Sequence, residues 1–303
     1  MNHVGNTPLI KLNRLVQPGW ADVYVKYEGG NPTGSMKDRM ALSMIEGAEL
    51  RGDLKPGDKV VEYTGGSTGA SLAMICANRG YTAHFVSSDA FAAEKLQTMR
   101  AFGAKLEIIP SDNGKLTAKL IDDMIARARE LSLQPNTFWT DQINNIDNRN
   151  AYHAMAREII GQLGTEIDEF MTGVGTGACF SGNAEVLKKE IPHIRCTAIE
   201  PEHVRFLSGG DTTGTHRLEG IGLDFIPSIY RADLQDDVMS VSDNDAYDTA
   251  RKLATMEGIW GGITSGANVW AALKRAKEIG PGKKIVTVII DSGLRYLNGE
   301  LYR

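Results

Sequence analysis

Short apolar runs and segments of helical periodicity alternate along much of the chain. Apolar runs at residues 59–62, 83–87 and 105–109 predict strands, and residues 70–78 and 92–102 between them predict helices. Strands separated by helices in this order pair in parallel, because the crossover helix returns the chain to the same end of the sheet. The pattern predicts an α/β protein with a mainly parallel sheet covered by helices.

The same alternation continues on both sides of this segment. A strand at 23–27 and a helix at 37–51 are predicted before it, and a helix at 116–130 after it. Residues 131–150 are rich in Asn, Gln and Asp and predict a loop, and residues 202–231 predict turns with few regular elements. Further helices and strands are predicted at 151–163, 169–173, 175–189, 195–199, 243–257, 267–278 and 284–290. The chain therefore predicts two α/β lobes meeting at a cleft, where small ligands bind in such folds.

Composition and charge exclude several classes of protein. The 303 residues correspond to about two domains, and the net charge of −5 without any Lys/Arg run argues against a nucleic-acid partner. No apolar run reaches the roughly 18 residues of a membrane helix, and the N-terminus lacks the pattern of a signal peptide. The 3 cysteines form no CxxC pair, and the 6 histidines show no metal-binding spacing. We expect a cytoplasmic protein with no metal site.

Three loops follow the order strand, glycine-rich turn, helix. Glycine lets the backbone approach an anion closely, and the start of a helix offers N–H groups and a favourable dipole. Each loop taken alone is about equally consistent with an anion-binding site and with an ordinary turn. Three together predict that more than one anionic group is held. Their sequences are Thr64-Gly65-Gly66-Ser67-Thr68-Gly69, Gly173-Val174-Gly175-Thr176-Gly177-Ala178 and Gly261-Gly262-Ile263-Thr264-Ser265-Gly266.

The second loop also matches a dinucleotide-binding pattern. Gly173, Gly175 and Ala178 fit G-x-G-x-x-G/A between a strand and a helix, and Glu200 could accept a hydrogen bond from a ribose. An NAD-binding oxidoreductase is therefore an alternative interpretation. The chain shows no evident partner for hydride transfer, such as a histidine beside an acid.

Lys37 is the most informative single residue. It follows a Pro/Gly turn and falls in the first turn of the helix predicted at 37–51, where a cation is electrostatically disfavoured. An amine held there and partly desolvated is nucleophilic, as Schiff-base chemistry requires. The alternative is a solvated lysine paired with Asp38 or Glu46, which the residue types alone favour because most lysines are exposed.

The stretch around Lys37 resembles a known motif. Asn31-Pro32-Thr33-Gly34-Ser35-Met36-Lys37-Asp38-Arg39 resembles the pyridoxal-phosphate (PLP) lysine motif of the cysteine synthase and cystathionine β-synthase family, whose fold is PLP fold type II (tryptophan synthase β-like). The resemblance covers nearly the whole chain in order. Its other segments are 5–9, 64–69, 140–142, 173–177, 219–222, 262–266 and 292–297.

The resemblance implies a role for each matched residue. Lys37 would bind PLP as a Schiff base and act as the base at Cα. The cofactor phosphate would lie on Gly175, Thr176, Gly177, Ala178 and Cys179, and Ser265 would hydrogen-bond the pyridine nitrogen. The substrate carboxylate would be bound by Thr64, Gly65, Gly66, Ser67, Thr68 and Gln142, and the loop at Gly220 would border the pocket.

The sequence also departs from the family pattern in the first glycine loop. The usual loop is Thr-Ser-Gly-Asn-Thr-Gly. Here Gly65 replaces the serine, and Ser67 replaces the asparagine that contacts the cofactor. Cys179 stands where threonine is usual and is interpreted as a small buried hydrophobe. Asp291 stands where the family often has proline.

The resemblance also implies a domain organisation and a reaction. The large cofactor-binding lobe would comprise residues 1–39 and 144–303, and a small mobile lobe, residues 40–143, would close over the substrate. The reaction would be β-replacement on an amino acid with a β-leaving group, such as O-acetylserine or O-phosphoserine, through an α-aminoacrylate. A small nucleophile such as sulfide would add, and the enzyme would be a homodimer. The alternatives are a β-elimination lyase and a regulatory protein that keeps the cofactor but little chemistry.

Overall fold

The computed structural model describes residue 1, residues 3–223 and residues 225–303, and its contacts divide the chain into two compact units. Unit 1 comprises Met1–Val4 and Lys37–Asn148, and unit 2 comprises Gly5–Met36 and Arg149–Arg303. The chain passes from unit 2 into unit 1 between Met36 and Lys37. The predicted mobility of a small lobe stays a prediction.

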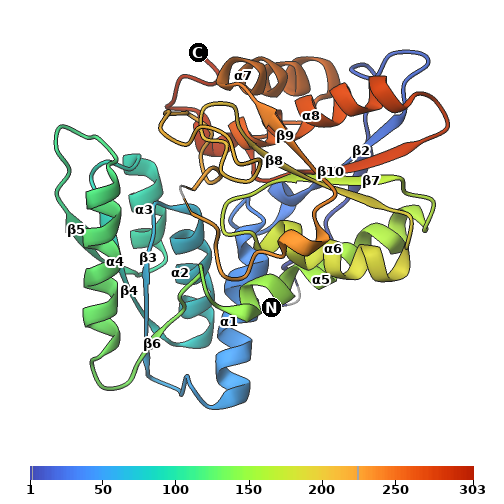
Figure 1. Ribbon diagram of the computed structural model, residues 1–303. Helices are drawn as coiled ribbons and strands as arrows, with labels where there is room; N and C mark the ends of the chain where they lie inside the picture. The colour runs from blue at the N-terminus through green and yellow to red at the C-terminus, as the bar shows by residue number, and fades with distance from the viewer. Residues whose placement is uncertain (2, 224) are drawn as a thin grey trace. The chain divides into compact units, whose positions relative to one another are not determined.

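Unit 1 is built on a parallel sheet with the strand order β5-β4-β3-β6. Figure 1 shows α4 on one face of this sheet and α1, α2 and α3 on the other. The parallel sheet predicted from residues 59–109 is confirmed. Its elements are α1 (Lys37–Arg51), β3 (Lys59–Tyr63), α2 (Ser67–Arg79), β4 (Thr82–Ser88), α3 (Ala93–Ala101), β5 (Lys105–Ile109), α4 (Ala118–Ser132) and β6 (Thr137–Trp139).

The loop predicted at residues 131–150 is wrong in two places. β6 pairs with β3 along Thr137–Trp139, and helix α5 (Ile146–Leu163) begins before residue 150. β6 is a half-buried edge strand of 3 residues, so it lacks the apolar run that identifies a longer strand. The start of α5 is stabilised locally, because the backbone N–H of Asp147 donates to Asn145 Oδ1 over 2.9 Å.

Unit 2 contains a sheet with the order β1-β2-β10-β7-β8-β9, in which β1 is antiparallel and the other pairs are parallel. In Figure 1, α7 and α8 lie on one face and α5 and α6 on the other. Strands β1 and β9 lie at the edges of the sheet and were not predicted. The strands are β1 (Leu9–Lys11), β2 (Asp22–Tyr27), β7 (Glu169–Gly173), β8 (Arg195–Pro201), β9 (Asp237–Val241) and β10 (Lys284–Ile289), and the helices are α6 (Ala178–Glu190), α7 (Asp243–Lys252) and α8 (Ile263–Ile279).

Helix α7 ends earlier than the periodicity predicts. The predicted helix at 243–257 is α-helical only to Lys252 and continues as one π-helical turn, Leu253–Glu257. Gly258, at a φ of +69°, then ends the helix in the left-handed conformation that glycine adopts without strain.

The three cysteines, Cys76, Cys179 and Cys196, are buried and form no disulfide bond. No helix in the described part of the chain is long and apolar enough to cross a membrane. Among the described residues, no group of three or more His, Cys, Asp or Glu side chains could hold a metal ion.

Buried polar side chains join the N-terminal segment to the turn before Lys37. Glu28, which is fully buried, accepts hydrogen bonds from Thr7 Oγ1 at 2.6 Å and from Asn31 Nδ2 at 2.8 Å. Asn31 Oδ1 in turn accepts from the backbone N–H of Gly5 over 2.8 Å. The two motifs at residues 5–9 and 31–39 are therefore parts of one hydrogen-bonded structure.

Lys26 stabilises the same region from β2. Its Nζ is buried and lies 2.7 Å from Glu158 Oε2, and it donates to Thr7 O over 2.6 Å and to Gln162 Oε1 over 3.0 Å. A buried ammonium group is tolerated only when it is paired and hydrogen-bonded in this way.

We predict that Lys26→Met destabilises the protein by about 3 kcal/mol, because it removes the buried cation that pairs with Glu158 and donates to Thr7 O and Gln162 Oε1. The free energy of unfolding in urea measures the change. Lys11→Met is the matched control on β1, because Lys11 pairs with Asp22 at the surface, where side-chain exposures are 46% and 40%. The control substitution should lower the free energy of unfolding by less than about 1 kcal/mol. Equal effects of the two substitutions would contradict the interpretation.

Candidate active site

The glycine loop after β7 lies at the carboxyl edge of the parallel strands of unit 2. Helix α6 begins at Ala178, and its N-cap, Gly177, makes no side-chain capping bond and has a φ of +82°. Gly177, Ala178 and Cys179 are buried, whereas Gly175 and Thr176 are partly accessible. The N-cap residue thus offers α6 no capping side chain, and the start of a helix is a position that suits an anion.

The segment around Gly220 packs directly on this loop. A Cβ added to Gly175 would lie 2.0 Å from the backbone oxygen of Gly220, so only glycine fits there. Gly222 N–H donates to Val174 O over 3.1 Å, and Thr264 Oγ1 donates to Glu219 O over 2.7 Å. The structure thus brings together the predicted phosphate loop and the predicted pocket border at Gly220.

Ser265 lies in the first turn of α8 and is fully buried. Its Oγ accepts a hydrogen bond from the backbone N–H of Ile290 over 2.9 Å. A hydroxyl has one proton to donate, and this bond uses one of its lone pairs. Ser265 is therefore suited to donate its own proton to a neighbouring acceptor.

The backbone of Ile290 also fixes the turn that precedes Lys37. Ile290 O accepts from the N–H of Met36 over 2.9 Å, and Ser35 forms an antiparallel bridge with Asp291. Lys37 is the next residue after Met36, begins α1 and is partly buried. The chain before Lys37 is thus attached to the residue that orients Ser265.

Asp291 has a defined role that the residue types did not predict. It is buried, and its Oδ2 accepts a hydrogen bond from Tyr296 Oη over 2.8 Å. Burial, together with the charge of Asp291, raises the pKa of Tyr296 well above its ordinary value. Tyr296 therefore stays neutral and donates to Asp291.

In unit 1, the loop after β3 is held by the side chain of Thr64. Thr64 Oγ1 accepts from the N–H groups of Gly66 at 3.1 Å and Gly69 at 3.0 Å. Thr68 Oγ1 donates to Gln142 Oε1 over 2.8 Å, so the loop and Gln142 are directly joined. The predicted carboxylate-binding residues of unit 1 therefore form one connected group, with Ser67 as the first residue of α2.

The structure explains the glycine that departs from the family pattern at position 65. A Cβ on Gly65 would lie 2.6 Å from the ring of Phe91. A serine there requires the aromatic ring to move. Gly66 has a φ of +149° and packs on the aliphatic part of Lys95, so a side chain at that position is strained as well.

Two buried polar residues beside the glycine loops were not predicted as functional. Asn268 Oδ1 accepts from the N–H of Gly173 over 2.8 Å, and its Nδ2 donates to Val288 O over 2.8 Å. Glu62 is a fully buried acid in β3, two residues before Thr64. A lone polar residue at an otherwise apolar position is the signal that could have identified both.

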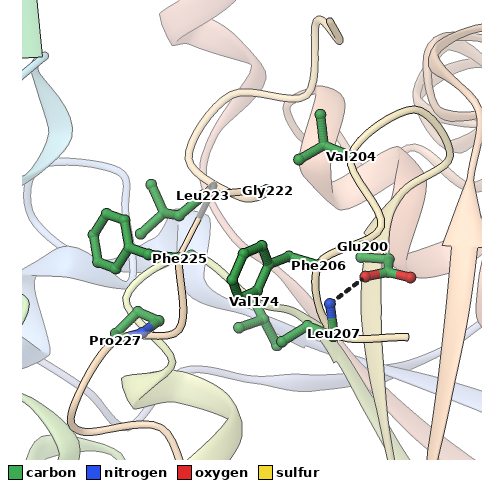
Figure 2. A pocket seen from close by; sticks show the side chains of 10 residues that line it. Val174, Glu200, Val204, Phe206, Leu207, Gly222, Leu223, Phe225 and Pro227 are labelled. Carbon is green, nitrogen blue, oxygen red and sulfur yellow. Dashed lines mark hydrogen bonds between the residues drawn. The ribbon is translucent and has the colours of Figure 1, made fainter. Parts of the chain in front are cut away.

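Glu200 does not have the accessible carboxylate that ribose binding requires. Its Oε2 accepts from the N–H of Leu207 over 2.8 Å (Figure 2), and its Oε1 accepts from Ser208 Oγ. Figure 2 shows Val174, Phe206 and Phe225 around the hollow beside it. Glu200 thus holds the 202–210 segment against β8.

Comparison with known proteins identifies the family. Residues 1–291 match the family described as pyridoxal-phosphate dependent enzyme. A cysteine synthase from Staphylococcus aureus is 42% identical over 301 residues, which are 99% of this chain and 95% of that protein. The chain belongs to the pyridoxal-phosphate dependent enzyme family, and it is a PLP-dependent enzyme.

Solved structures share the fold over nearly their whole length. A hydrogen sulfide-producing enzyme from Fusobacterium nucleatum has a TM-score of 0.89 and 38% identity, with 98% of both chains covered. A cysteine synthase from Entamoeba histolytica has a TM-score of 0.91 and 34% identity, with 99% of this chain and 89% of that chain covered. The predicted fold type II and the predicted cofactor are confirmed, and the dinucleotide-binding interpretation is wrong.

The residues of unit 2 fit PLP. The phosphate needs the positive start of a helix and close backbone approach, which the N-terminus of α6 and Gly175 provide. The ring nitrogen needs a partner, and Ser265 has a hydroxyl proton to offer.

We predict that Gly175→Ala weakens the retention of PLP by about tenfold or more, because the new methyl group must displace the backbone at Gly220. The absorbance of bound cofactor after dialysis measures the loss. Gly161→Ala is the control, since Gly161 lies in α5 with no atom within 4 Å of an added Cβ. The control should keep its cofactor and gain up to about 1 kcal/mol of helix stability. Full cofactor retention by the Gly175 variant would contradict the assignment of the cofactor phosphate to this loop.

Proposed function

We propose that the protein catalyses PLP-dependent β-replacement on an amino acid with a β-leaving group, such as O-acetylserine or O-phosphoserine, with a small nucleophile such as sulfide. The observation that carries the proposal is the attachment of the Lys37 turn and Ser265 to the same residue, Ile290. Its full-length relatives named cysteine synthase support the same reaction.

Lys37 has two tasks in this proposal. Its amine holds the cofactor covalently and, once released by the substrate amine, accepts the proton from Cα. Bound PLP supplies an electron sink that makes this Cα proton acidic and lets the β-substituent leave. The bond from Met36 N–H to Ile290 O fixes the backbone from which the Lys37 side chain extends.

Ser265 sets the kind of chemistry that follows. Its Oγ accepts from Ile290 N–H and so donates toward the ring nitrogen, which must then be unprotonated to accept the bond. An unprotonated ring withdraws electrons less strongly than a protonated one. Loss of the Cα proton and of the β-substituent is therefore favoured over transamination.

The glycine loops supply the two anion sites. We assign the cofactor phosphate to Gly175, Thr176, Gly177, Ala178 and Cys179, and the substrate carboxylate to the loop from Thr64 to Thr68 with Gln142. Thr68 and Gln142 are already joined by their side chains, so one ligand can be held by both. Ser67 has a shorter side chain than the asparagine usual in the family, so its contact with the cofactor is assigned through a bridging water.

β-Elimination is the second candidate. The Fusobacterium nucleatum neighbour is described as a hydrogen sulfide-producing enzyme, and Gly65 removes a hydroxyl from the carboxylate-binding loop. In a lyase the product is pyruvate and ammonia, whereas in a synthase the nucleophile adds to Cβ.

An assay with and without sulfide separates the two reactions. The purified protein is given O-acetylserine, O-phosphoserine, serine, threonine or cysteine, and both pyruvate and new thiol are quantified. We expect an activated serine ester with sulfide to yield a stoichiometric amount of cysteine and little pyruvate. Pyruvate as the main product in the presence of sulfide would assign the protein to the lyases.

We predict that Lys37→Ala abolishes turnover, with a loss of at least about 1,000-fold, because both covalent attachment and proton transfer at Cα depend on the amine. Borohydride reduction followed by peptide mass spectrometry should label Lys37 in the native protein and leave the variant unlabelled. Lys59→Ala is the control, since Lys59 Nζ bonds Gln134 at the surface, and it should keep activity and label. Labelling of another lysine in the native protein would overturn the assignment.

We further propose a homodimer in the cytoplasm with a mobile small lobe, as the family resemblance implies. Light scattering of the purified protein determines the number of subunits.

A further inference from the structure

Glu62 is an acid in the middle of unit 1. It lies in β3 with no exposed surface, on the face opposite to Val61 and Tyr63, because side chains alternate along a strand. Val61 contributes to the apolar cluster that α4 covers, together with Met124 and Ala128. Burying an ionisable group at such a position costs free energy unless hydrogen bonds within the protein replace those that it made to water.

Four donors converge on the Glu62 carboxylate. Its Oε1 accepts from the backbone N–H of Tyr63 at 2.9 Å and from Trp139 Nε1 at 3.4 Å. Its Oε2 accepts from Thr140 Oγ1 at 2.7 Å and from the backbone N–H of Gln142 at 3.0 Å. A carboxylate is the side chain that accepts at all of these positions at once.

These bonds hold the segment that carries Gln142 against β3. Asp141, between Thr140 and Gln142, has a φ of +45°, a left-handed conformation that is uncommon outside glycine although Asp tolerates it better than most residues. Asn148 Nδ2 donates to Gln142 O over 2.7 Å and supports the segment from the other side. The backbone of Gln142 is therefore fixed at both its N–H and its C=O.

The side chain of Gln142 is oriented by the same arrangement. Its Oε1 accepts from Thr68 Oγ1 over 2.8 Å, and its Nε2 donates to Tyr63 O over 3.3 Å. Tyr63 is also the residue whose N–H bonds Glu62. A movement of Gln142 away from Glu62 would therefore also disturb its contact with Thr68 in the glycine loop.

We propose that Glu62 is a positioning residue for the substrate carboxylate: it holds Gln142 beside the Thr64–Thr68 loop and so prepares the anion site before the amino acid arrives. The inference rests on the assignment of Gln142 and this loop to the substrate carboxylate. Glu62 touches neither substrate nor cofactor and acts through Gln142.

The retention of an acid at this position fits the proposal. Burial raises the pKa of Glu62 to about 7, while its hydrogen bonds with Thr140 and Gln142 oppose the rise. An apolar side chain would avoid this cost but would leave two backbone N–H groups unsatisfied. The acid is therefore explained by the donors that it organises.

Glu62→Gln is an informative substitution because a side-chain amide has one end that accepts hydrogen bonds and one end that only donates them. Tyr63 N–H and Trp139 Nε1 can only donate, so the amide oxygen is best placed at the Oε1 position. The amide NH2 then takes the Oε2 position, where the Thr140 hydroxyl can rotate to accept but the N–H of Gln142 cannot. The variant thus selectively removes the bond to Gln142.

The experiment measures steady-state kinetics of the holoenzyme with O-acetylserine and sulfide. Glu62→Gln should raise the KM for the amino acid by about tenfold or more, with kcat and the KM for sulfide changed less than about threefold. A purely structural role would lower the amount of folded enzyme, and therefore kcat, at an unchanged KM. An unchanged KM for the amino acid overturns the inference.

Two further variants complete the test. Glu169→Gln is the matched control, because Glu169 is a buried glutamate of β7 that accepts from Thr197 and pairs with Arg275 in unit 2, and its KM should not change. If Glu62→Gln does not fold, Glu62→Asp retains the charge but shortens the reach to Gln142, and the same criteria apply.

Gln142→Ala distinguishes the inference from the proposed function. If its KM for the amino acid stays at the native value, the carboxylate assignment itself fails. If its KM rises while that of Glu62→Gln does not, only the role of Glu62 is refuted.

Discussion

The backbone of Ile290, directly after β10, is the constraint that joins the turn before Lys37 to the Ser265 hydroxyl. Its N–H orients the Ser265 hydroxyl, and its C=O holds Met36, the residue before Lys37. β10 lies between β2 and β7 in the sheet, so it is bonded on both sides and cannot shift without breaking those bonds. The turn that ends at Met36 and the hydroxyl of Ser265, far apart in sequence, are thus both bonded to the residue that follows one inner strand.

The two units stabilise their glycine loops by similar means but with different side chains. Under the loop after β7, the side-chain amide of Asn268 accepts from the N–H of Gly173 and donates to Val288 O. A neutral group with one donor and one acceptor is therefore sufficient there. Beside the loop after β3, four donors converge on Glu62, and a group that only accepts is needed. In each case the donors and acceptors that surround the position determine which buried polar residue fits it.

Much of the fold could be predicted because its central elements carry their own local pattern. Helix α1 and strands β5 and β7 begin and end where the hydrophobic pattern predicts. The edge strands β1, β6 and β9 were missed, because they are short or half exposed and exist through pairing with a distant neighbour. The candidate site residues could be listed from motifs, but Asn268 and Glu62 belong to no motif and are recognised by what they contact.

The sequence by itself determined the class of enzyme, since the lysine motif, the glycine loops and their order along the chain are local features that a linear pattern records. Only the tertiary structure decided how these groups are oriented: that Ser265 accepts from Ile290, that Gly175 must be glycine because of Gly220, and that Gly65 makes room for Phe91. The physical reason is that hydrogen-bond direction and steric exclusion depend on atoms contributed by distant parts of the chain, and no local pattern contains them.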